Sequence, residues 1–420
     1  FGLSFLLQLL AAFSLDMFIG EAGLGKSRLV HTMKQHVLGQ MIEGEVDAPV
    51  IEWRCSPHFQ NTRLYPAIDF YERALAFDRE EPVEARFERM VHRLERYDLA
   101  QQETVPLWAS LLSLLIPDRF PPLSLSPVRQ REETFRALME WLHTRATRKP
   151  ILFIVEDLHW VDASSLEFLG QFMAEGLHDS ILTLLTFRPE FKTPWPAVAH
   201  QTSLALNRLT RRQVADLMTK KVKRVLPDAV VKQVYDRAGG VPLFVEEFTR
   251  MVQESGVADQ EGAPGEPLPE HAIPATLQDL MMARLDRMEG ERDVAQLASV
   301  LGREFAYEVL AAVNSVDEPT LQMELAKLVQ EEILYPKGRL PRCSYIFKHA
   351  LVEDALYNTL VKNKRQQFHR QVAEVLEAQF PQTTAARPEL IAHHFSEAGV
   401  AEKAVRYWLK AGLRSRERSA

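Results

Sequence analysis

The sequence predicts an α/β domain with a parallel sheet, followed by units built from helices. A glycine-rich loop follows a short apolar run at residues 17–19. A second apolar run, at residues 151–155, ends in Glu156 and Asp157, and only helical patterns follow Arg208. Continuous apolar runs of this length are typical of strands that are buried on both faces of a parallel sheet.

The composition allows several packed domains and limits the classes of partner. The 420 residues are 46% hydrophobic and 25% charged, which supports about two to four domains with buried cores. A net charge of −7 argues against a nucleic-acid-binding surface and is neutral toward a protein partner. The two cysteines, Cys55 and Cys343, have no metal-ligand spacing, which predicts buried thiols in a reducing, cytoplasmic protein.

The start of the chain is apolar and uncharged. It begins with Phe1 rather than Met, so we expect a fragment or a processed chain, or a truncated or out-of-frame start. A signal peptide needs a basic start, and Asp16 interrupts the run before it reaches membrane-spanning length. We therefore expect residues 1–16 to form a buried helix or strand beside the loop, with no membrane contact.

The glycine-rich loop has the G-x-x-x-x-G-K-S pattern of phosphate-binding loops. Its glycines let backbone N–H groups turn toward phosphate oxygens. In this pattern Lys26 neutralises the β- and γ-phosphates, Ser27 ligates Mg²⁺, and the helix beginning near Arg28 presents its positive end. We expect a nucleoside triphosphate to bind here, at Gly20, Glu21, Ala22, Gly23, Leu24, Gly25, Lys26 and Ser27.

The acidic pair at residues 156 and 157 follows the expected third strand, at the edge where open α/β sheets bind ligands. One carboxylate would hold Mg²⁺, and the other would polarise the attacking water. The first acid usually serves the metal, but here it is the longer Glu156, so both roles stay open for Glu156 and Asp157. Arg188, after the fourth strand, is a candidate sensor of the γ-phosphate, or else a surface arginine paired to Glu190.

Stretches rich in glycine and proline predict the domain boundaries. Gly240-Val241-Pro242 should end one helix and begin the next, and a stretch rich in Gly, Pro and acidic residues predicts a linker. Strands are expected near 17–19, 48–55, 151–155, 181–187 and 202–206. The predicted units are an α/β domain at 1–206, a helical lid at 207–254, a linker at 255–272, a winged helix at 273–347 and a helical region at 348–420.

The winged helix is predicted from helices near 275–288, 291–301, 304–313 and 319–331, followed by a hairpin that turns at 337–339. This shape often binds DNA, but the last of these helices is mainly acidic, so we expect no direct contact with nucleic acid. The final helices resemble the first unit of a tetratricopeptide (TPR) array, which predicts a protein partner and allows self-association. His369, His393 and His394 lack a third ligand at useful spacing and are expected in the core or on the surface.

Taken in order, the motifs resemble those of the ATPase region of STAND-class signalling proteins. That region is a P-loop ATPase of the AAA/ORC-like type. Within that class they are most similar to regions attached to bacterial class III adenylate/guanylate cyclases. The resemblance covers the chain from Gly20 onward and rests on residues 20–27, 55–58, 64–66, 156–162, 186–191, 240–247, 273–277, 301–305 and 347–351.

The resemblance implies a P-loop NTPase core of the ASCE type, with ATP or ADP and Mg²⁺ as ligands. It implies the phosphate and metal roles given above for Lys26 and Ser27. It further implies that Pro242 lies against the adenine, and that His349 touches the β-phosphate in a closed state. Residues 1–16 do not match, and the cyclase catalytic domain is absent, so no cyclase activity is expected.

We therefore expect an ATP-binding regulatory switch of a signalling protein. Hydrolysis should be slow, because no arginine finger in cis is evident. Two alternatives remain: the ATPase module of a DNA-binding transcription regulator, or a scaffold that binds nucleotide without hydrolysing it.

Overall fold

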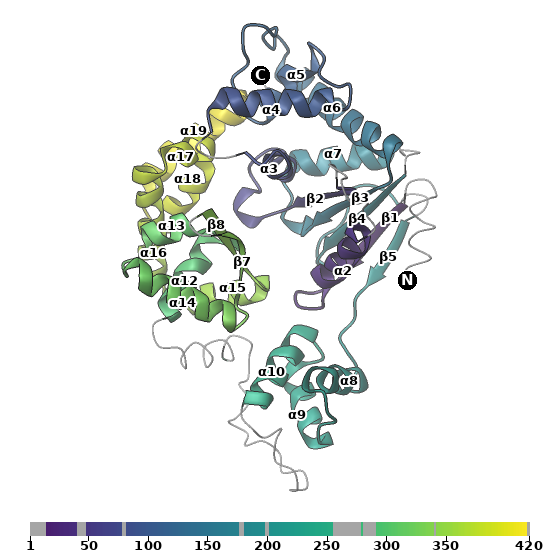
Figure 1. Cartoon of the computed structure of the whole chain (residues 1–420), viewed down its shortest axis with the longest axis vertical. Helices are drawn as coiled ribbons and strands as arrows, with labels where there is room; N and C mark the ends of the chain where they lie inside the picture. The colour runs from purple at the N-terminus through teal and green to yellow at the C-terminus, as the bar shows by residue number, and fades with distance from the viewer. Residues whose placement is uncertain are drawn as a thin grey trace.

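The structure is a computed structural model of the whole chain (Figure 1). It describes residues 14–39, 48–77, 81–175, 180–197, 201–254, 279, 291–339 and 342–417. The α/β domain, the helices α8 to α10, the winged helix and the C-terminal helices follow one another along the chain. The expected linker and the expected helix at 275–288 lie outside the described residues, apart from Asp279.

The first domain is built on a five-stranded parallel sheet, as predicted. The strand order is β2-β3-β4-β1-β5. Because all strands run in the same direction, the loops after their carboxyl ends share one edge. The strands are β1 (Ser14–Ile19), β2 (Val50–Arg54), β3 (Ile151–Glu156), β4 (Ile181–Phe187) and β5 (Gln201–Ala205).

Alternating side chains of these strands fill two apolar cores, one on each face. Leu152 and Ile154 pack toward the helix α2, whereas Phe153 and Val155 join the larger core on the other face. Figure 1 shows α2 on one side of the sheet and α3 and α7 on the other. The helices are α2 (Lys26–Leu38), α3 (Tyr65–Ala74), α4 (Val83–Glu95), α5 (Thr104–Leu111), α6 (Pro127–Arg148) and α7 (Ala163–Ala174), with 3-10 turns η1 (Pro57–Phe59) and η2 (Leu158–Trp160).

Three helices follow the sheet: α8 (Arg211–Val222), α9 (Asp228–Ala238) and α10 (Pro242–Glu254). Thr210 and Gln213 form a reciprocal capping box at the start of α8. Gly239 has a positive φ at the end of α9, and Pro242 begins α10, as the sequence predicts.

The winged helix differs from its prediction in two places. Residues Glu304–Ala306 form a short strand, β6, rather than the start of a helix, because they pair with β8. Residues 337–339 continue β7 rather than turning, because they pair with residues 342–344. The antiparallel sheet has the order β6-β8-β7. Its elements are α12 (Glu291–Leu301), α13 (Tyr307–Val313), α14 (Glu318–Gln330), β7 (Leu334–Arg339) and β8 (Arg342–Phe347).

The C-terminal helices share one continuous core with the winged helix and with α8 to α10. They are α15 (Ala350–Thr359), α16 (Lys362–Gln379), α17 (Pro381–Ala386), α18 (Pro388–Glu397) and α19 (Ala401–Glu417). An ion pair of 2.8 Å between Arg387, at the start of α18, and Glu72 connects these C-terminal helices to α3 of the first domain. None of the described helices has the length and apolar character needed to cross a membrane.

Candidate functional site

The glycine-rich loop connects β1 to α2 in the manner of a phosphate-binding loop. Gly25 caps α2 with φ 95, in the left-handed region that favours glycine. Gly20 donates its N–H to Phe187 O at 3.2 Å, which fixes the start of the loop beside the end of β4. Ser27 is exposed, so its hydroxyl in the first turn of α2 is accessible to solvent.

Lys26 is folded back over its own loop. Its ammonium donates to Gly20 O at 2.6 Å and to Glu21 O at 2.9 Å, and the residue is 7% exposed. Burial lowers the pKa of Lys26, and the charge of Asp157 acts in the opposite direction. A phosphate group in the loop would give this ammonium a better partner than two neutral carbonyls.

The loop is covered by residues from the second half of the chain. Leu243, at the start of α10, donates its N–H to Gly23 O at 3.3 Å. A Cβ on Gly23 would lie 2.9 Å from Val241 Cγ1 and 3.0 Å from Leu351 Cδ1. Val241, the residue before α10, and Leu351 of α15 therefore pack directly on the phosphate-binding loop, and this close approach requires glycine.

The acidic pair lies at the same sheet edge as the loop, separated from it by β4. Asp157 has a left-handed backbone with φ 56, and its N–H donates to Thr186 Oγ1 at 3.0 Å. The charge of Asp157 acts to raise the pKa of Lys26. Burial and, to a smaller extent, the charge of Glu52 on β2 raise the pKa of Glu156 to about 7.

Arg188 follows β4 and lies between the loop and η2. Its guanidinium carbon is 5.9 Å from the centre of the Trp160 ring, and its charge lowers the pKa of Lys26. The charge of Glu190 opposes this effect on Lys26. Asp157 and Arg188 thus both affect the pKa of Lys26 through their charges. That these three residues act in one site stays a prediction.

His349 is the N-cap residue of α15, two residues before the leucine that covers Gly23. Burial and the nearby cations Lys348 and Arg303 lower the pKa of His349 to about 4. Its Nε2 is buried and has no hydrogen-bond partner among the described residues. The side chain of Arg28 is 80% exposed, and its Nη1 lies 3.8 Å from Glu246 Oε1.

Arg303 is a site residue that the sequence reasoning missed. It follows α12, and its guanidinium lies 3.5 Å from Asp157 Oδ2. Its carbonyl accepts from Phe347 N at 2.9 Å, which fixes it beside the end of β8. Residues 301–305 stand out in the sequence as a motif, but no pattern links that motif to an acid 146 positions earlier.

Two carboxyl groups of α15 also have shifted pKa values. Burial raises the pKa of Glu353 to about 8, and it raises the pKa of Asp354, which the charge of Arg188 lowers. The charge of Asp157 also acts to raise the pKa of Asp354.

The donor set suits Mg²⁺ carried by a nucleotide. Ser27, Glu156 and Asp157 offer only oxygen atoms, which Mg²⁺ prefers, and Mg²⁺ commonly uses one or two protein ligands together with phosphate oxygens. No group of three or more His, Cys, Asp or Glu residues suitable for a metal ion occurs in the described part of the chain.

The sheet order, the loop after β1 and the acids at the end of β3 are typical of a P-loop nucleotide-binding fold. Residues 9–184 match the family model described as the AAA ATPase domain.

Similarity over the whole chain is more distant. A protein of Rhizobium meliloti (strain 1021), described only as uncharacterized, is 25% identical over 417 residues, or 97% of this chain. This chain spans 39% of that protein's length. A STAND protein with a tetratricopeptide repeat sensor from Pyrococcus horikoshii is 12% identical with a TM-score of 0.48, covering 96% of this chain and 56% of that one. The ORC2 protein of Aeropyrum pernix is 12% identical with a TM-score of 0.32, covering 90% and 92%.

Proposed function

We propose that this chain binds ATP with Mg²⁺, hydrolyses it slowly, and acts as a regulatory switch within a signalling protein. The observation that carries the proposal is the packing on Gly23. Val241, directly before α10, and Leu351 of α15 pack on the phosphate-binding loop of the α/β domain. A nucleotide in the loop would therefore lie next to residues from three parts of the chain.

The proposed roles follow the positions of the side chains. Backbone N–H groups of the loop and Lys26 bind the phosphates, and Ser27 and Asp157 hold the metal. Glu156 is the second carboxylate for the attacking water, and Arg188 senses the γ-phosphate. When bound, Mg²⁺ supplies positive charge that stabilises the transferring phosphoryl group.

Two residues from outside the α/β domain complete the proposed site. His349 carries a buried ring nitrogen without a partner near the loop, which supports a contact to a β-phosphate. Pro242 begins the helix whose N-terminus meets Gly23, which supports a place beside the base.

Switching follows from this arrangement. A nucleotide can shift the equilibrium between a closed and an open chain only by its different affinity for the two states. Because α15 continues into the C-terminal helices, any displacement of Leu351 moves the partner-binding region that we propose there. The more specific proposal is that this chain is related to the ATPase regions that accompany adenylate/guanylate cyclases. It rests on the order of the motifs in the sequence.

The test is isothermal calorimetry with ATP and MgCl₂. Lys26→Ala should abolish binding, because it removes the cation over the phosphates, while the exposed Lys232→Ala on α9 should bind like the parent. Tight ATP binding by Lys26→Ala would refute the assignment of the loop.

Hydrolysis is tested separately. Glu156→Gln should keep ATP binding and lose phosphate release, because an amide cannot accept the proton of the attacking water. A parent that binds ATP but releases no phosphate would instead support the alternative of a non-hydrolysing scaffold.

A further inference from the structure

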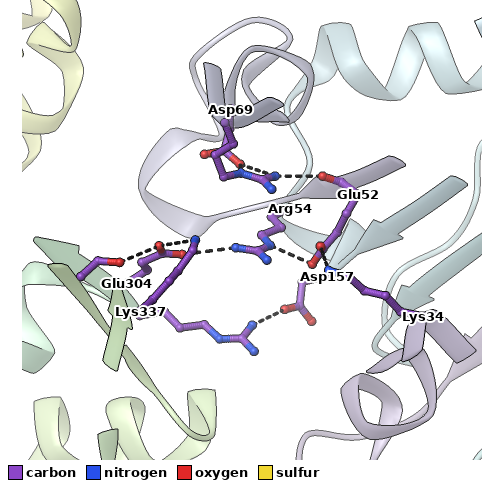
Figure 2. A network of polar contacts seen from close by, with 10 residues as sticks. Lys34, Glu52, Arg54, Asp69, Asp157, Glu304 and Lys337 are labelled. Atoms are coloured by element: carbon purple, nitrogen blue, oxygen red, sulfur yellow. Dashed lines mark hydrogen bonds and ion pairs between the residues drawn. The ribbon is translucent and has the colours of Figure 1, made fainter. Parts of the chain in front are cut away.

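Two neighbouring residues of the winged helix, one cationic and one anionic, each form an ion pair with a residue of opposite charge at the edge of the parallel sheet (Figure 2). Arg303 Nη1 lies 3.5 Å from Asp157 Oδ2, and Arg54 Nη1 lies 3.2 Å from Glu304 Oε2. The partners sit at the ends of the adjacent strands β2 and β3, where Arg54 is in register with Glu156. We call the four residues Arg303, Glu304, Asp157 and Arg54 the clasp.

One half of the clasp is firmly anchored. Glu304 also accepts from Lys337 Nζ at 2.9 Å and from Ser344 Oγ at 3.1 Å. Arg54 also donates through Nε to Glu52 Oε1 at 2.9 Å, and Glu52 is buried. Figure 2 shows this network continuing from Glu52 to Lys34 on α2.

The other half is the weaker one. Arg303 and Asp157 form a single contact, with side chains 41% and 25% exposed. Half-exposed ion pairs of this kind contribute little to stability, so another cation can replace the arginine at small cost. Asp157 is also the carboxylate whose charge acts on Lys26 of the phosphate-binding loop.

We propose that Arg303 is the counter-ion of Asp157 in the metal-free state, and that it must leave this carboxylate when nucleotide-bound Mg²⁺ arrives. The proposal rests on the proposed function and adds a way for the winged helix to sense the metal. Loss of the Arg303 contact removes one of the two ion pairs of the clasp and leaves the pair between Arg54 and Glu304. Metal binding is thereby coupled to the attachment of the winged helix.

Arg303 lies 3.5 Å from Asp157 Oδ2, and its charge also acts on Glu156 and on His349. The counter-ion role is therefore distinguished from that of an arginine that stabilises the transferring phosphate by experiment.

The experiment is calorimetry of ATP binding at stepwise MgCl₂ concentrations. For Arg303→Gln, the Mg²⁺ concentration that gives half of the full affinity gain should fall roughly fivefold, the effect of one half-exposed ion pair. Binding of ATP in EDTA should not change, and Arg303→Lys should stay near the parent. The control is Arg406→Gln, which removes an ion pair with Glu377 inside the C-terminal helices.

A second readout is hydrogen exchange of β6 and β8. In the parent, Mg²⁺ with ATP should increase exchange there more than ATP in EDTA does. In Arg303→Gln, exchange should already be high without the metal.

The outcomes separate the two proposals. An unchanged Mg²⁺ midpoint in Arg303→Gln, with ATP binding intact, overturns the competition alone. If Arg303→Gln loses phosphate release while its Mg²⁺ midpoint is unchanged, the competition is overturned in favour of a catalytic role for Arg303. A parent that does not bind ATP overturns both the competition and the proposed function.

Discussion

A cluster of four histidines predicts that acidification weakens the docking of the C-terminal helices onto the α/β domain. His58 belongs to η1, and its ring centre is 4.9 Å from that of His393 on α18. His369 on α16 and His394 on α18 share a hydrogen bond of 2.9 Å between their Nδ1 atoms. One of these two Nδ1 atoms must therefore be unprotonated.

Burial keeps these rings neutral. It lowers the pKa of His58 to about 4, that of His369 to about 3, and that of His394 well below its usual value. The charged and polar groups that face the cluster are Tyr357, Arg365 and Glu397. Only Glu397 favours a protonated ring, and it acts on His393.

The sign of the effect follows from proton binding. Below pH 6.5 the unfolded chain binds protons at these histidines while the folded chain does not, so stability is complete above pH 6.5 and falls as the pH drops. At pH 5 a group with a folded pKa of about 4 or 3 contributes a loss of about 2 kcal/mol. His58 and His369 together then account for about 4 kcal/mol, a large share of the ~5–15 kcal/mol typical of a folded protein.

The assay compares thermal unfolding at pH 7.5 and pH 5. His58→Gln and His369→Gln should each reduce the difference between the two pH values, because glutamine does not titrate. His92→Gln, on the exposed face of α4, should leave the difference as in the parent. The reasoning fails if the double variant keeps the full pH dependence, or if His92→Gln reduces it equally.

Four further substitutions test the backbone conformation and packing around the site and its neighbouring elements. Alanine at Gly25 meets no atom within 4 Å and should cost about 1–2 kcal/mol for the left-handed backbone, as measured by thermal unfolding. Alanine at Gly23 should cost more, since it also clashes with Val241 and Leu351; equal losses would contradict that close packing. Asp162→Ala should cost about 2–3 kcal/mol, because the buried carboxylate accepts three backbone N–H groups, and a negligible change in denaturant midpoint would count against this. Arg387→Gln should cost about 1 kcal/mol and raise hydrogen exchange in η1, whereas unchanged exchange would show that its pair with Glu72 does not hold α18 in place.

Much of the first domain could be predicted from the sequence. Runs such as residues 151–155 and 181–187 are apolar at almost every position, which only a central parallel strand explains. The loop at residues 20–27 combines glycines, a lysine and a hydroxyl in a fixed local spacing, so its geometry is encoded within a few residues. For the same reason Pro242 correctly marks the start of α10.

The winged-helix sheet was harder to predict because its pairing is non-local. Residues Glu304–Ala306 carry no strong strand signal, and they become a strand only beside β8. The stretch at residues 337–339 contains a glycine and two cations that favour a turn, but cross-strand pairing extends β7 through it. The domain boundaries and the roles of the site residues stay predictions.

The sequence by itself determined the phosphate-binding loop, the acidic pair and the buried parallel strands, because each depends on residues that are close neighbours along the chain. Only the tertiary structure decided what faces that loop. It brought Leu351 onto Gly23 and Arg303 onto Asp157, and it gathered His58 with the histidines of α16 and α18. These contacts join residues more than a hundred positions apart, and they depend on how separate units pack, which no local spacing records.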